Sequence, residues 1–316
     1  MDATRRHLIL SGLGLGAAAA LGPAALARPR GPAGAAREEL FRISLAEWSL
    51  HRTIGAGELT NLDFARVAKQ EFGLDAIEYV SLFFPRGATD FDSLRELRAR
   101  AEDQGVRSLL IMIDGEGQLA DADDAQRRTA IENHFKWIAA AKFLGCHSIR
   151  VNAGGGGTPE EQMERAADSL HRLAGMGEQY GIDVIVENHG GLSSNGAWLA
   201  ETIRRADHPR CGTLPDFGNF DLGGGKWYDR YQGIAEMMPF ARAVSAKSHE
   251  FDAEGNETRT DYSRMLKIVV DAGYHGYVGI EFEGDGIPER EGIAKTKALL
   301  ERVRARLSAP AGGGRG

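Results

Sequence analysis

Four apolar segments in the second half of the chain each end in a side chain that can transfer a proton or bind a metal ion. These side chains are Glu187 in VIVENHGG, Asp216 in LPDFGNF, His249 in SAKSHEFD and Glu281 in GYVGIEFEG. Carboxylates and imidazoles are the commonest general acids and bases. Three carboxylates with one imidazole also suit a divalent ion such as Mn²⁺, Mg²⁺, Co²⁺ or Zn²⁺. The successive spacings of 29, 33 and 32 residues indicate that each residue ends one copy of a repeated unit.

The repeated unit is a strand followed by a helix. Short apolar runs alternate with longer segments of helical periodicity from residue 41 to residue 307. Strands are expected at 41–50, 74–84, 106–115, 146–155, 182–191, 211–220, 241–252 and 276–286. Helices are expected at 61–73, 90–105, 124–145, 159–181, 195–206, 229–240, 261–273 and 288–307.

Eight such units predict an α/β fold, a single (β/α)8 TIM barrel. A doubly wound sheet has fewer strands and usually opens with a Gly-x-Gly-x-x-Gly sequence, which does not follow the first expected strand. In a TIM barrel the carboxyl ends of all strands share one rim, where active sites lie. The four side chains are therefore expected to meet there.

A gathering of carboxylates requires compensating positive charge. Like charges at close range raise one another's pKa, and a divalent cation removes this conflict. The alternative use of the four side chains is a set of independent salt bridges to arginines and lysines of the rim.

The segments DAIEYV, VIVENHGG, LPDFGNF, SAKSHEFD and GYVGIEFEG resemble the xylose isomerase-like TIM-barrel family, the sugar phosphate isomerase/epimerase superfamily, over residues 40–305. The resemblance implies one divalent metal ion held by Glu187, Asp216, His249 and Glu281. It also implies a sugar isomerase or epimerase in which Glu187 and Glu281 are the acid/base pair. One carboxylate would remove a proton next to a carbonyl, and the other would return it to the enediolate, which the metal stabilises.

Two positions leave parts of this assignment open. Ketose 3-epimerases of the family usually carry a histidine three residues after the strand-six aspartate, where this chain has Asn219. The substrate class is therefore open. Glu283 faces the same side of its strand as Glu281 by alternation, so either glutamate could be the strand-eight ligand.

Further side chains near the strand ends are candidates for contact with the substrate. They are His189, Asn219, Lys247, Glu78, Trp48 and His51, with Arg150 and Asn152 alternating along strand four. An aromatic ring such as that of Trp48 can stack on the face of a sugar. Lys247 could act as an electrophile or base, or could form a structural salt bridge.

Other functions are compatible with the same residues. The metal site could serve a lyase or hydrolase that removes a proton next to the keto group of a 3-keto-glycoside and expels the aglycone. A non-catalytic periplasmic sugar-binding barrel is a further alternative, although such a protein has no need of metal ligands. The superfamily also includes abasic-site endonucleases, which use three zinc ions and many histidines, whereas this acidic chain has nine histidines.

The amino-terminal segment is typical of targeting rather than of a folded domain. Arg5 and Arg6 precede an apolar, alanine- and glycine-rich stretch that ends in Ala25-Leu26-Ala27, a cleavage pattern. This arrangement resembles a twin-arginine export signal, with an uncleaved leader or a general secretion signal as alternatives. We expect a signal peptide at 1–27, a disordered spacer at 28–39, the barrel at 40–307 and a flexible tail at 308–316. The mature protein would then be periplasmic.

Composition narrows the choice of partners. The net charge of −7 argues against a nucleic-acid partner, because nucleic-acid-binding proteins carry basic patches. The leader is too weakly apolar for a permanent transmembrane helix, so no stable membrane insertion is expected after cleavage. Cys146 and Cys211 are expected to be small buried residues rather than a disulfide. A small carbohydrate is the expected partner, and a homo-oligomer is compatible with the composition.

Overall fold

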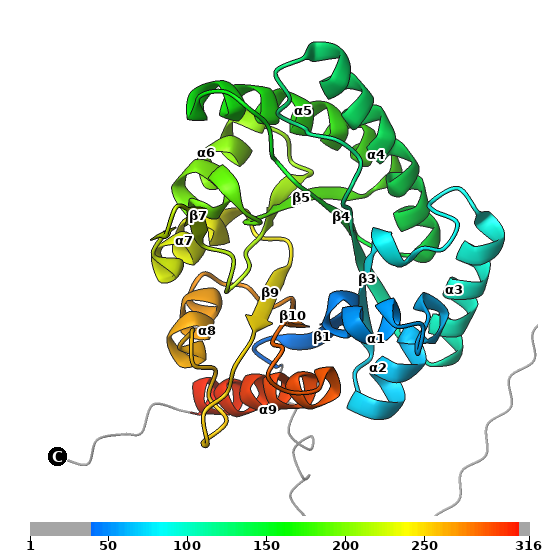
Figure 1. The fold of residues 1–316 in the computed structure, drawn as a ribbon, viewed down its shortest axis with the longest axis vertical. Coiled ribbons are helices and arrows are strands. Elements are labelled where there is room, and N and C mark those ends of the chain that lie inside the picture. The colour runs from blue at the N-terminus through cyan, green and yellow to red at the C-terminus, as the bar shows by residue number, and fades with distance from the viewer. Residues whose placement is uncertain (1–38, 310–316) are drawn as a thin grey trace, which may run out of the picture. The chain divides into compact units, whose positions relative to one another are not determined.

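The computed structural model describes residues 39–309. The expected signal peptide, the spacer as far as residue 38 and the tail from residue 310 lie outside the described residues. Figure 1 shows a central ring of strands surrounded by helices.

Eight parallel strands form the wall of the ring. They are β1 (Arg42–Ala46), β2 (Ala76–Val80), β3 (Arg107–Met112), β4 (Ser148–Val151), β5 (Asp183–Glu187), β6 (Cys211–Leu214), β9 (Val244–Ser248) and β10 (Tyr277–Phe282). Hydrogen-bonded neighbours follow the order β6-β5-β4-β3-β2-β1-β10-β9. The order begins with β6 and ends with β9. Two isolated parallel bridges, Thr213 with Ala241 and Asp216 with Ser245, join these two ends of the sheet and close the ring. The predicted (β/α)8 barrel is confirmed.

Each strand of the ring is followed by a helix that covers its outer face (Figure 1). The long helices are α2 (Phe64–Phe72), α3 (Phe91–Asp103), α4 (Asp124–Leu144), α5 (Pro159–Tyr180), α6 (Gly196–Ala206), α7 (Arg230–Met237), α8 (Tyr262–Asp271) and α9 (Glu289–Ser308). The short ones are η1 (Glu47–Leu50), α1 (His51–Gly55), η2 (Asn61–Asp63), η3 (Ser81–Phe83), η4 (Gly191–Ser194) and η5 (Met238–Phe240).

Capping residues determine where several helices begin and end. The side chains of Asp90 and Asp123 accept hydrogen bonds from backbone N–H groups in the first turns of α3 and α4. Thr158 and Glu161 form a capping box at the start of α5. Gly145 ends α4 with a φ of 82°, a left-handed conformation that glycine adopts without steric cost.

The strands are shorter than the apolar runs that predicted them. β1 ends at Ala46, so Trp48 and His51 lie in η1 and α1 rather than in a strand. The expected strand 211–220 ends at Leu214, and a hairpin of β7 (Asp221–Gly223) and β8 (Lys226–Trp227) follows it. This hairpin was not predicted, and its turn depends on positive φ angles at the three glycines 223–225.

The core has two layers. The larger lies between the strands and the surrounding helices and includes both free cysteines, Cys146 and Cys211, which are buried as predicted. A smaller cluster groups apolar side chains of several strands: Ala46, Val80, Leu110, Met112, Ile185, Leu214 and Ala243. The long helices therefore form a shell whose packing fixes the position of each strand end.

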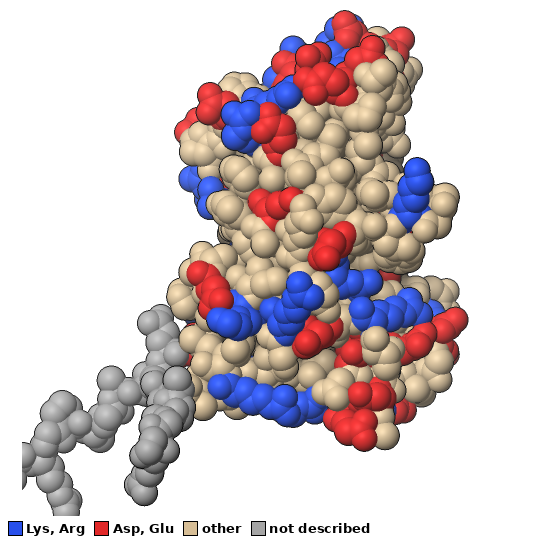
Figure 2. Space-filling view, turned by 90° about the vertical axis from the view of Figure 1, so that its left-hand side faces the viewer, with Lys and Arg blue, Asp and Glu red and all other residues tan. Residues whose placement is uncertain are grey.

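The surface mixes charges of both signs. Figure 2 shows Lys and Arg side chains interspersed with Asp and Glu side chains on one face. This mixture differs from the basic stripe typical of a nucleic-acid-binding face. Within residues 39–309, none of the helices combines the length and the apolar character needed to cross a membrane.

Candidate active site

Three of the four predicted metal ligands meet at the carboxyl-terminal rim of the barrel. Glu187 is the last residue of β5, Asp216 lies two residues beyond β6, and Glu281 lies near the end of β10. One oxygen atom of each lies within 4.8 Å of the others. All three side chains are buried, with residue exposures of 1%, 0% and 4% respectively. These three carboxylates, hereafter the carboxylate trio, could hold one metal ion.

Asp216 is fixed by the loop that follows it and by the neighbouring strand. Its Oδ1 accepts hydrogen bonds from the backbone N–H groups of Gly218 and Asn219, both at 2.8 Å. Ser245 Oγ lies 2.6 Å from Asp216 Oδ2 and 2.8 Å from Glu281 Oε2. A hydroxyl has one proton to donate, so these two carboxyls can both hydrogen-bond to Ser245 only when one of them is protonated.

The carboxyl of Asp216 has a high affinity for a proton. Burial raises its pKa to about 7; nearby Glu187 and Glu281 add to this rise and Lys247 opposes it. Asp216 therefore exchanges between its charged and neutral forms close to neutral pH.

Glu187 has one oxygen that is hydrogen-bonded and one that is not. Its Oε1 accepts a hydrogen bond of 2.9 Å from Asn219 Nδ2. Arg150 Nε lies 2.9 Å from Oε2, but the two atoms are not aligned, so Oε2 has no hydrogen-bond partner among the described residues. Burial raises the pKa of Glu187 to about 7, while Arg150 opposes the rise and Glu281 adds to it. A carboxyl with this pKa, one of whose oxygens accepts no hydrogen bond, is suited to general acid/base catalysis.

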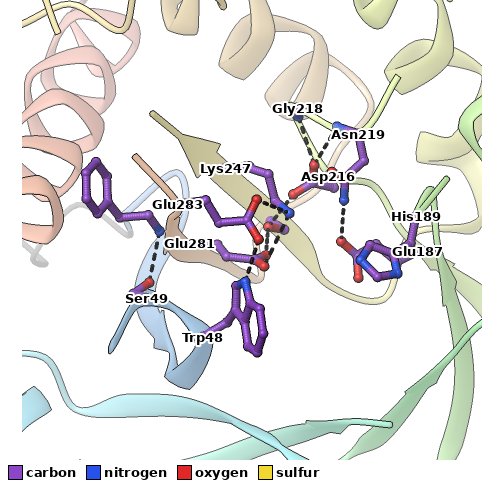
Figure 3. A network of polar contacts seen from close by, with 12 residues as sticks. Trp48, Ser49, Glu187, His189, Asp216, Gly218, Asn219, Lys247, Glu281 and Glu283 are labelled. Atoms are coloured by element: carbon purple, nitrogen blue, oxygen red, sulfur yellow. Dashed lines mark hydrogen bonds and ion pairs between the residues drawn. The ribbon is translucent and has the colours of Figure 1, made fainter. Parts of the chain in front are cut away.

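Lys247 places an ammonium group against the carboxylate trio. It pairs in register with Glu281 across β9 and β10, and its Nζ lies 3.4 Å from Glu281 Oε1 and 3.0 Å from Glu283 Oε2 (Figure 3). Burial disfavours the charge on Lys247, but the carboxylates of Glu281, Asp216 and Glu283 outweigh it and raise the pKa of the amine. Lys247 is therefore charged inside the site.

His249, the fourth predicted ligand, is not brought into the trio. β9 ends at Ser248, and His249 Nε2 lies 3.9 Å from Glu283 Oε2. Lys247, two residues earlier, is the β9 side chain level with Glu281. The expected strand continued to residue 252, whereas β9 ends one residue before His249. Burial lowers the pKa of His249, and Arg259 lowers it further.

The structure also shows which of the two glutamates, Glu281 or Glu283, belongs to the carboxylate trio. Glu281 belongs to the carboxylate trio, whereas Glu283 Oε1 accepts a hydrogen bond from Trp48 Nε1. Burial favours the neutral form of Glu283, but Lys247 outweighs it and lowers the pKa. The strand-eight member of the trio is therefore Glu281.

A cavity of about 180 Å³ opens beside Glu281. It is lined by Trp48, Val80, Leu82, Met112, Asp114, Arg150, His189, Glu281 and Glu283. This lining combines apolar with ionisable side chains, which suits a small polar molecule with a hydrocarbon face, such as a sugar.

His189 lines this cavity, as its candidacy for substrate contact requires. Its Nδ1 lies 3.1 Å from Asn152 Oδ1. Burial lowers the pKa of His189, and the charges of Arg150 and Lys247 lower it further. The imidazole is therefore neutral at neutral pH and can donate or accept one hydrogen bond.

Two other candidates lie away from the cavity wall. Glu78 is buried in the barrel, where Ser44 Oγ donates a hydrogen bond of 2.6 Å to its Oε1. Burial raises the pKa of Glu78 to about 8. His51 stacks on Trp48 with ring centroids 4.8 Å apart, and Phe83 stacks on the same indole at 5.8 Å.

A second cavity of about 190 Å³ has His249 in its lining. Asn219 lines it, and Trp227, 60% exposed on the β7–β8 hairpin, forms part of its wall together with Arg230 and Arg259. Asn219 therefore lines this cavity and also donates a hydrogen bond to Glu187.

Sequence reasoning missed two polar residues of the site. Ser245 lies two residues before Lys247, so the period of two along a strand indicates the same inward face. Asp114 follows β3 and pairs with Arg150 at 2.9 Å. Only the fold shows that Asp114 is close to strand four, because the pairing depends on the register of β3 and β4.

A closed ring of eight parallel strands with ionisable side chains at its carboxyl-terminal rim is the arrangement in which TIM barrels place their active sites. The chain belongs to the xylose isomerase-like TIM barrel family, whose profile matches residues 64–303, more than half of the sequence. A search of curated proteins gave no match.

Solved structures share this fold at low sequence identity. D-psicose 3-epimerase from Clostridium cellulolyticum H10 is 14% identical, with a TM-score of 0.64 over 85% of this chain and 100% of that one. A 3-keto-D-glucoside 4-epimerase from E. coli is 15% identical, with a TM-score of 0.62 over 77% of this chain and 94% of that one. A sugar phosphate isomerase/epimerase from Parabacteroides distasonis is 16% identical, with a TM-score of 0.65 over 85% and 96%.

Proposed function

We propose that this protein is a sugar isomerase or epimerase that moves a proton at the carbon next to a carbonyl group. The observation that carries the proposal is the meeting of Glu187 and Glu281, two buried carboxylates from β5 and β10, with oxygen atoms within 4.8 Å of each other. The cavity reaches Glu281 and the cationic side chain of Arg150. Two carboxylates beside a cation provide a base, an acid and a charge that stabilises an enediolate.

Each group has a distinct task in this reaction. Glu187 Oε2, which has no hydrogen-bond partner in the described structure, accepts the proton from carbon. Glu281 returns a proton to the opposite face of the planar intermediate. Trp48, whose ring is stacked with His51 and Phe83, adds apolar surface to the cavity wall. His189 and Asn219 supply hydrogen bonds to the sugar hydroxyls.

The identity of the cation decides how the intermediate is stabilised. A divalent metal would supply Lewis-acid stabilisation of the enediolate, and the carboxylate trio offers oxygen ligands for it. The remainder of the predicted ligand set fits poorly, because His249 lies outside the trio and the Lys247 ammonium contacts Glu281. The proton transfers assigned to Glu187 and Glu281 require no step at a metal.

The substrate class is narrower than sugars in general. The similar folds include an epimerase of a free ketose and an epimerase of a 3-keto-glucoside, which supports a keto-sugar. Among keto-sugars a glycoside is favoured, because Trp227 on the wall of the second cavity offers an aromatic surface for an aglycone. Elimination of the aglycone after the same proton abstraction is therefore the second candidate reaction.

Solvent exchange tests the proposed function directly. The protein is incubated in D₂O with free ketohexoses and with 3-keto-glycosides, and the signal of the proton next to the carbonyl is followed by ¹H NMR. Loss of that signal with formation of the epimer supports epimerisation, and release of aglycone supports elimination. No exchange with any keto-sugar, with or without added Mn²⁺, would contradict the proposal.

We also propose that residues 1–27 direct export and that the reaction takes place in the periplasm. Support comes from Arg5, Arg6 and the Ala25-Leu26-Ala27 pattern. Keto-sugars without a phosphate fit that compartment, and the cavity beside Glu281 contains one arginine, Arg150.

A further inference from the structure

We propose that the ammonium group of Lys247, rather than a bound metal ion, is the cation that stabilises the intermediate in this barrel. This inference rests on the proposed function and names the catalytic group that the function requires. It makes the proton transfer independent of divalent metals.

The first argument is the position of Lys247. Its side chain is 2% exposed and extends from β9 toward the carboxylate trio (Figure 3). The ammonium lies 3.4 Å from Glu281 Oε1 and 3.0 Å from Glu283 Oε2. An ion coordinated by Glu281 would share that carboxylate with a fixed positive charge and would be repelled by it.

The oxygen atoms of the carboxylate trio are already occupied by donors from the protein. Asp216 Oδ1 accepts two backbone N–H groups, and its Oδ2 contacts Ser245 Oγ, as does Glu281 Oε2. Glu187 Oε1 accepts the amide of Asn219. Together with Lys247 at Glu281 Oε1 and Arg150 at Glu187 Oε2, protein donors contact all six oxygens, although the contact at Glu187 Oε2 is an ion pair without a hydrogen bond.

The third argument is the missing nitrogen ligand. β9 offers Lys247 at the level of Glu281, and His249 lies beyond the end of the strand near Glu283. A protonated lysine donates hydrogen bonds and cannot coordinate a metal. The strand that would complete the metal site instead contributes a positive charge.

The step that follows is balanced without a co-reactant. Glu187 Oε2 takes the proton from carbon, the C–H electron pair forms the C=C bond of the enediolate, and the carbonyl π electrons move to oxygen. The oxyanion accepts a hydrogen bond from Lys247 Nζ. Glu281 then passes a proton from water to the other face of the carbon, and Glu187 releases its proton to water.

Metal titration of the purified full chain tests the inference. Mn²⁺ and Co²⁺ are titrated into wild type and Lys247→Met by isothermal calorimetry, and the exchange activity of the wild type is measured after treatment with EDTA. Lys267→Met is the matched control, since Lys267 is an exposed lysine paired with Asp271 on α8. Thermal melting followed by circular dichroism reports whether each variant is folded.

We expect wild type and Lys267→Met to bind neither ion in the millimolar range and to keep full exchange activity in EDTA. Lys247→Met, relieved of the ammonium, is expected to gain one Mn²⁺ or Co²⁺ per chain. Its metal-free exchange rate should fall about 10²–10³-fold, which is typical for loss of one charge-stabilising donor.

Tight binding of one ion per chain by wild type, with loss of activity in EDTA, would overturn the inference. The wild-type titration gives this answer even when Lys247→Met fails to fold. The titration also separates the two proposals, because it needs no substrate. Absence of exchange with every keto-sugar contradicts the proposed function, whereas a metal-binding wild type contradicts only the role of Lys247.

Discussion

Burial sets the proton affinities at the rim of this barrel. Glu187 and Asp216 are at most 1% exposed, and loss of hydration raises the pKa of each to about 7 despite nearby positive charges. A carboxyl in water is ionised throughout the physiological range. At the residue scale the barrel thus turns ordinary carboxylates into groups that gain and lose protons near neutral pH.

The pH dependence of exchange follows from Glu187. The base acts only when ionised, so the exchange rate should rise with pH through about 7. Asn219→Ala removes the amide that donates to Glu187 Oε1, which favours the protonated form. The midpoint of the pH–rate profile should therefore move to higher pH in this variant. An unchanged midpoint would exclude Glu187 as the group that titrates in the profile.

Glu78 links stability to pH. Its pKa is about 8 in the folded protein and 4.5 in the unfolded reference, so the folded state holds a proton that the unfolded chain has lost. The stabilisation is complete below about pH 4.5 and disappears as pH rises through about 8, at about 1.4 kcal/mol per pH unit between the two values.

Glu78→Gln should remove this dependence. The amide keeps an oxygen for the hydrogen bond from Ser44 and carries no charge at any pH. Urea unfolding of both proteins between about pH 5 and about pH 9 measures the effect. We expect the variant to gain stability relative to wild type with rising pH, and parallel curves would contradict the assigned pKa.

At the scale of elements, the alternation of apolar runs and helical segments was enough to predict eight units and their order. Lengths were predicted less well, because a strand ends where pairing ends rather than where apolar residues end. Val80 and Leu82 belong to one apolar run, but β2 stops at Val80 and η3 begins at Ser81. For the same reason His249 lies beyond the end of β9 and outside the trio, whereas the expected meeting of Glu187, Asp216 and Glu281 is observed.

Packing between strands β10 and β2 can be tested with two glycines. A Cβ atom on Gly279 would lie 2.5 Å from Glu78 Oε1, whereas a Cβ on Gly175 in α5 meets no heavy atom within 4 Å. We expect Gly279→Ala to destabilise the fold by about 1–3 kcal/mol through overpacking. Gly175→Ala should stabilise the fold by up to about 1 kcal/mol, because alanine is the better helix former. Equal effects in urea unfolding would contradict the close contact of β10 with Glu78.

At the scale of the whole molecule, the barrel lies apart in sequence from the proposed export signal at residues 1–27. All strands and helices of the ring lie within residues 39–309. A chain that begins at residue 28 is therefore expected to fold and to melt like the full chain.

Export can be tested in the leader without altering the barrel. Replacing Arg5 and Arg6 by lysine should abolish export by a twin-arginine route and leave the protein in the cytoplasm, as measured by cell fractionation. Lys substitution keeps the positive charge, so a general secretion signal would still function. Unchanged periplasmic yield would therefore contradict the twin-arginine assignment.

The most direct test removes one carboxylate at a time. Each epimer of a keto-sugar substrate is incubated in D₂O with a variant that lacks one of the two carboxylates, and both solvent exchange and epimerisation are measured. Glu187→Gln and Glu281→Gln are compared by ¹H NMR with wild type and with Glu254→Gln, a matched change at an exposed site. The account predicts that both site variants lose epimerisation by about 10²–10⁴-fold. Each should retain solvent exchange with only the one epimer whose proton faces the remaining carboxylate. Undiminished epimerisation by either variant would contradict the two-carboxylate mechanism.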